Sequence, residues 1–95
     1  SYRLDAAAGR PWSAIQLGAN RYHFTNVSGG RLAMITLTPF GATHVEVEDS
    51  PEPHTVPVPI DAGASFVAVV RGRGARITAT AVPSMTNTYS DFVPA

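Results

Sequence analysis

The segment that most constrains the fold is residues 22–39, YHFTNVSGGRLAMITLTP. In its first part Tyr22 and Phe24 alternate with polar residues, and side chains on a β-strand point to opposite faces with period two. Residues 26–30 (NVSGG) tolerate positive φ and hydrogen-bond their own backbone, which favours a chain reversal. The pattern therefore predicts a β-hairpin whose second strand covers residues 31–39.

Two stretches carry apolar side chains on both faces, residues 32–37 (LAMITL) and residues 65–70 (SFVAVV). Such a strand lies centrally in a sheet, or its second face is covered by another segment or another molecule. Because a two-sheet sandwich covers one face of each sheet, the outer face needs an occupant. The outward-facing side chains predicted by strict alternation are Leu32, Met34, Val67 and Val69.

The other expected strands are separated by turns rich in glycine and proline. They are residues 12–17, 44–48, 55–60, 76–81 and 88–92. Pro57 and Pro59 mark residues 55–60 as an edge strand, because proline has no N–H to donate to a neighbour. No window shows the period of an amphipathic helix. The sequence predicts an all-β antiparallel sandwich of seven or eight short strands, with a small β-barrel as the alternative.

The length of 95 residues fits one domain. Residues 1–11 predict an N-terminal arm, followed by a single sandwich domain over 12–95. Cysteine is absent, so neither disulfides nor thiolate metal sites are available. No stretch approaches the ~18 apolar residues of a membrane span, and the first residues lack a signal-peptide pattern. We therefore expect a cytoplasmic protein, with the virion as the other location considered.

The formal net charge is zero, and all seven basic residues are arginine. A neutral chain argues against a nucleic-acid or membrane partner and makes self-association easier. Residues 71–76 (RGRGAR) gather positive charge at one turn, whereas residues 46–52 gather negative charge. These clusters predict a head-to-tail contact between copies, the alternative being two unrelated surface loops.

Neither a metal site nor a catalytic site is predicted. His44, Glu46 and Glu48 share one face of a strand, but on a flat strand they point in parallel and do not converge on an ion. The chain has no Gly-x-Ser-x-Gly motif and no cysteine, and its histidines fall on outward positions without a pocket. We expect no cofactor and no enzymatic activity.

The order of these signals resembles the immunoglobulin-like or fibronectin-III-like accessory sandwiches of bacteria and their phages. The resemblance covers about residues 21–81 and is carried by the strand ending in Asn26, the turn at 28–30 (SGG), residues 59–66 (PIDAGASF) and the threonine-rich strand that follows. It implies binding or assembly, and it carries no catalytic residues. In size, lack of cysteine and terminal arms the chain is also similar to small decoration and tail proteins of tailed phages.

The predicted function is a non-catalytic structural or protein-interaction module that docks on copies of itself or on a larger assembly. Two alternatives are a phage capsid or tail decoration protein and a carbohydrate-binding module built on exposed aromatic rings. The candidate rings are Tyr2, Trp12, Tyr22, Phe40 and Tyr89. The predicted interface residues are Leu32, Met34, Glu46, Glu48, Val67, Val69, Arg71, Arg73 and Arg76.

Overall fold

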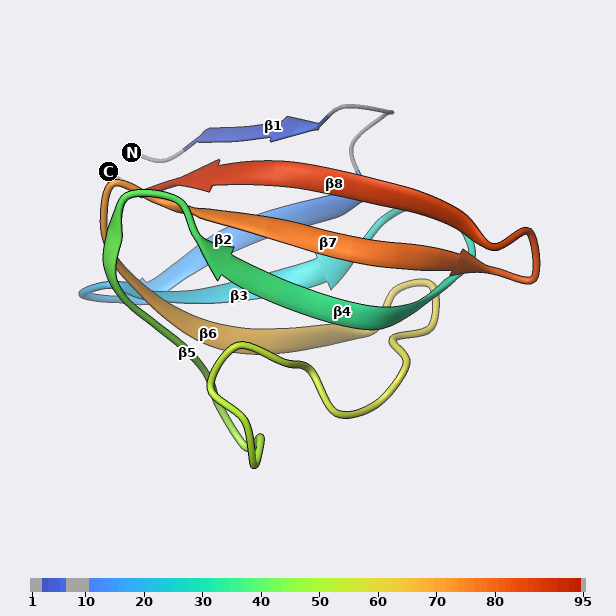
Figure 1. The fold of residues 1–95 in the computed structure, drawn as a ribbon, viewed down its shortest axis with the longest axis horizontal. Helices are drawn as coiled ribbons and strands as arrows, with labels where there is room; N and C mark the ends of the chain where they lie inside the picture. The colour runs from blue at the N-terminus through green and yellow to red at the C-terminus, as the bar shows by residue number, and fades with distance from the viewer. Residues whose placement is uncertain (1–2, 7–10, 95) are drawn as a thin grey trace.

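The computed structural model describes residues 3–6 and 11–94, which form eight strands (Figure 1). The strands are β1 (Arg3–Ala6), β2 (Trp12–Gly18), β3 (Arg21–Asn26), β4 (Arg31–Pro39), β5 (Ala42–Val47), β6 (Ser65–Gly72), β7 (Ala75–Val82) and β8 (Thr86–Val93). Within these residues no helix is long and apolar enough to cross a membrane.

The strands form two four-stranded antiparallel sheets that face each other and do not close into a barrel. One sheet has the order β1-β8-β7-β4 and the other β2-β3-β6-β5 (Figure 1). The predicted sandwich is thus confirmed. Its core contains an aromatic cluster in which Phe24 lies 5.2 Å from Phe66 and 5.0 Å from Phe92, measured between ring centroids. The alternating strands meet there because each turns its apolar side inward.

The predicted hairpin over residues 22–39 is wrong, although both of its strands exist. β3 pairs with β2 and β6, whereas β4 pairs with β7 in the opposite sheet. Asn26 redirects the chain: its Nδ2 donates to the carbonyls of Gly30 (2.7 Å) and Ile60 (2.9 Å), and its Oδ1 accepts from Ser28 N–H (2.9 Å). The turn therefore crosses between the sheets.

A β-bulge in β4 changes which side chains face the core. Met34 adopts φ 54°, and the register with β7 shifts around it. Leu32, Ile35 and Leu37 are all buried as a result, while Met34 is 73% exposed. The outward orientation predicted for Leu32 is wrong, because strict alternation does not survive the extra residue of a bulge.

The segment 55–60 forms no regular strand and instead crosses beside β4. It meets β4 at two isolated bridges, Leu32 with Ile60 and Thr36 with Thr55. In the strand order β4 is the edge strand of its sheet and is not central, and this segment covers part of its free edge. β6 is central as predicted, between β3 and β5.

The expected N-terminal arm contains strand β1, which pairs with β8 from Arg3 opposite Val93 to Ala6 opposite Ser90. Residues 1–2 and 7–10 of that arm lie outside the described residues.

Candidate binding surface

The apolar residues predicted for the interface do not form one surface. Val67 and Val69 lie on the outer face of β6, where they are half-buried. Val67 has His23 beside it in the register, and Val69 lies between Arg21 and Glu46. Met34 belongs to the edge of the other sheet.

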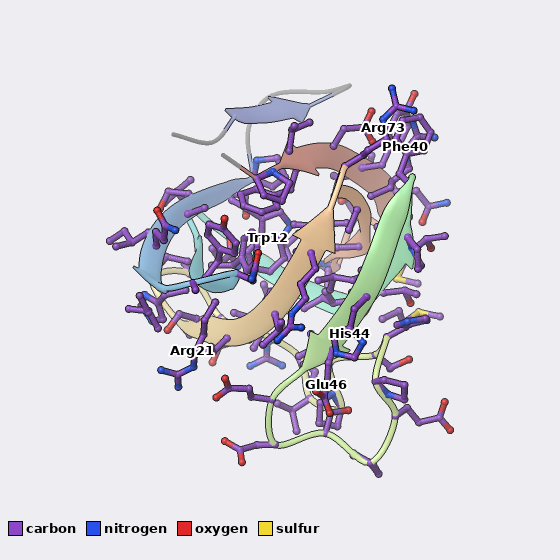
Figure 2. The ribbon with its side chains drawn as sticks, turned by 90° about the vertical axis from the view of Figure 1, so that its left-hand side faces the viewer. Trp12, Arg21, Phe40, His44, Glu46 and Arg73 are labelled. Carbon is purple, nitrogen blue, oxygen red and sulfur yellow. The ribbon has the colours of Figure 1, made fainter. Side chains whose placement is uncertain are left out.

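The acidic side chains of β5 and of Glu48, the residue after it, have partners within the molecule. His44 Nε2 lies 3.5 Å from the Oε1 atom of Glu46, and both side chains are exposed (Figure 2). Glu48 accepts two hydrogen bonds from Arg21, one of them 2.9 Å from Nη2. These hydrogen bonds lower the pKa of Glu48. Glu48 therefore has a partner in its own chain.

Arg76 is likewise paired, and it organises two exposed aromatic rings. Its guanidinium donates to both carboxylate oxygens of Asp91 at 2.7 and 3.1 Å, and these bonds lower the pKa of Asp91. The same guanidinium carbon lies 5.2 Å from the ring centroid of Phe40 and 5.2 Å from that of Tyr89. Two cation–π contacts thus hold both rings beside β7.

Arg71 and Arg73 make no ion pair with any described residue. Arg73 lines an open groove of about 660 Å³ at the end of the sandwich where the β4–β5 and β6–β7 turns meet the C-terminal residues. Figure 2 shows Arg73 and Phe40 close together at this end. We call this site the arginine–aromatic groove; its lining residues are Phe40, Gly41, Gly72, Arg73, Val93 and Pro94.

Two glycines allow the turns around the groove to approach closely. Gly41 has φ +81°, and a Cβ there would lie 3.0 Å from Cβ of Arg73. At Gly74 a Cβ would collide with the carbonyl oxygen of Phe92. The Phe40 N–H donates to the Gly74 carbonyl at 2.8 Å, which fixes one turn against the other. The glycines therefore place Phe40 beside Arg73.

The groove combines side chains that are common at protein–protein contacts. Aromatic residues and arginine are enriched where partners bind, because they contribute large contact areas and several hydrogen-bond donors. Arg73 is one of the predicted interface residues, but Val93 and Pro94 are not. Phe40 lies between Pro39 and Gly41, a turn sequence. An aromatic residue inside such a turn is the sequence signal that could have indicated the groove.

Other candidate chemistry is sparse in residues 3–6 and 11–94. No group of three histidine, aspartate or glutamate side chains is arranged to hold a metal ion there. His23 Nε2 lies 2.6 Å from Ser65 Oγ on the open outer face of the sheet. Among the described residues no carboxylate is hydrogen-bonded to His23, so the third member of a catalytic triad does not accompany this pair.

Comparisons of the chain with protein-family models, with curated proteins and with solved structures found no match.

Proposed function

We propose that this protein is a non-catalytic interaction module that docks on copies of itself or on a larger assembly through the arginine–aromatic groove. The supporting observation is an arginine without an ion pair among the described residues, Arg73, beside an exposed phenylalanine, Phe40, in an open groove. A phage capsid or tail is one form that such an assembly can take.

The charge at the groove indicates the chemistry of the partner. Arg76 contributes little free charge because Asp91 neutralises it, so Arg73 is the cation in the groove that has no ion pair among the described residues. A guanidinium binds a carboxylate through two parallel hydrogen bonds, which gives both attraction and orientation. Phe40, 59% exposed, supplies the apolar contact. The groove thus fits a protein surface that presents carboxylates.

Binding of short labelled peptides, followed by fluorescence anisotropy, tests this proposal. A peptide rich in aspartate and glutamate should bind, and a lysine-rich peptide should not. Arg73→Glu should weaken binding about tenfold or more, since it replaces attraction by repulsion. Arg31→Glu is the matched control: it changes net charge equally, but Arg31 pairs with Asp61 away from the groove. Equal losses in both variants would contradict a specific site.

A carbohydrate-binding role is the second candidate, supported by the exposed rings of Phe40 and Tyr89. Trp12 and Tyr22 are buried in the core at 2% exposure and do not contribute to a stacking platform. Phe40 and Tyr89 both contact Arg76 and are 59% and 46% exposed, so part of each ring is accessible to a sugar. Titration with neutral glycans, monitored at the amide of Tyr89, would favour this role if saturable shifts appear that Tyr89→Ala abolishes.

A further inference from the structure

We infer that the partner of the arginine–aromatic groove is a second copy of this chain, which inserts the acidic loop at residues 48–53. This inference rests on the proposed function and specifies the partner. The contact runs head to tail, from the groove of one copy to the loop of the next.

The loop is rigid enough to act as an insert. Ser50 Oγ lies within hydrogen-bonding distance of the carbonyls of Glu52 and Thr55, and it accepts a bond from the Glu52 N–H. The Val47 N–H donates to the Pro53 carbonyl at 2.7 Å, closing the base of the loop. Pro51 further restricts the backbone. A preorganised loop loses little conformational entropy on binding.

The loop also carries charge that complements the groove. Asp49 and Glu52 are exposed and make no ion pair with any described residue. Arg73 is the matching cation in the groove. Because the formal net charge of the chain is zero, no overall repulsion opposes association of copies.

Position prevents the loop from filling the groove of its own chain. Strand β5 separates them, and its six residues span about 20 Å at the rise of an extended strand. Figure 1 shows the loop after β5 projecting from the body of the sandwich, and Figure 2 places Glu46 well away from Arg73. Complementary surfaces at two different places on one molecule produce a heterologous contact, which need not close at a dimer.

A charge-swap experiment tests this contact by analytical ultracentrifugation. A small interface of this kind binds weakly, so the concentration series should extend to about 1 mM. The average mass of the wild type should rise with concentration and fall again in high salt. Arg73→Glu and Glu52→Arg should each remain monomeric, whereas Arg31→Glu should associate as the wild type does.

The decisive sample is an equimolar mixture of the Arg73→Glu and Glu52→Arg variants. In this mixture the acidic groove of the first variant meets the basic loop of the second, while the native groove of the second meets the native loop of the first. The average mass of this mixture should again exceed that of the monomer. A wild type that stays monomeric, or a mixture that does not associate, would overturn the inference. If the acidic peptide still binds at Arg73 in that case, the proposed function stands and the second copy is excluded as partner.

Discussion

Replacing Asn26 by alanine should destabilise the fold by about 4 kcal/mol, since four hydrogen bonds of about 1 kcal/mol each are removed. Asn26 is 1% exposed. Its amide donates to the carbonyls of Gly30 and Ile60 and accepts from the N–H and hydroxyl of Ser28. The loss is a large fraction of the roughly 5–15 kcal/mol by which small domains are stable.

Two further variants isolate the cause. Asn26→Asp keeps the shape but cannot donate when ionised, so at neutral pH it should be at least as destabilising as alanine. Asn87→Ala removes an exposed asparagine with a single hydrogen bond to Thr80, and it should cost about 1 kcal/mol at most.

Guanidinium denaturation followed by circular dichroism measures these free energies, provided the dependence on denaturant is unchanged. A free energy of unfolding for Asn26→Ala within about 1 kcal/mol of the wild-type value would exclude this structural role for Asn26. An Asn26→Asp variant as stable as the wild type at neutral pH would exclude it as well.

Three further predictions concern a buried hydroxyl, strain and acid stability. Ser90→Ala should leave the free energy of unfolding unchanged or raise it by up to about 1 kcal/mol, because the buried Ser90 hydroxyl has no hydrogen-bond partner among the described residues; a clear loss in guanidinium denaturation would refute this. Met34→Gly should raise the melting temperature slightly, since a left-handed backbone costs an L-residue about 1–2 kcal/mol and the flexibility of glycine offsets only part of that; a lower melting temperature would count against strain at the bulge. The hydrogen bonds from Arg76 lower the pKa of Asp91. The contribution of this ion pair to the free energy of unfolding is therefore present above the pKa of Asp91 in the unfolded state, and it is lost as the pH falls through the pKa in the folded state. Asp91→Asn should therefore reduce the loss of stability in acid below about pH 4, measured as the change in the free energy of unfolding with pH. If this pH dependence is the same as in the wild type, the Arg76–Asp91 pair is excluded as a source of the acid sensitivity.

Alternation of side chains was enough to predict the two-sheet architecture, because burial of one face per strand follows from period two. It did not identify strand partners. The side-chain patterns of residues 22–26 and 31–39 fit a hairpin or two facing sheets equally well. The choice between them depends on the hydrogen bond from Asn26 to Ile60, which lies far away in sequence.

The candidate site was predictable only in part. The arginine-rich turn is visible in the sequence, but its division into a paired Arg76 and an Arg73 without an ion pair among the described residues depends on the register that places Asp91 opposite Arg76. No glycine or proline at Met34 indicates the bulge in the sequence. A prediction from alternation therefore places Leu32 on the wrong face. Contacts between distant segments decide such details, and local patterns do not contain them.

We propose the arginine–aromatic groove as the site where this protein binds a carboxylate-bearing partner. The most direct measurement is a two-dimensional amide NMR titration with the acidic peptide, which locates the contact without mutation. We expect saturable shifts centred on the amides of Phe40, Gly41, Gly72 and Arg73, with little change at Val67 and Val69. Shifts centred on the outer face of β6, or no shifts at saturating peptide, would contradict it.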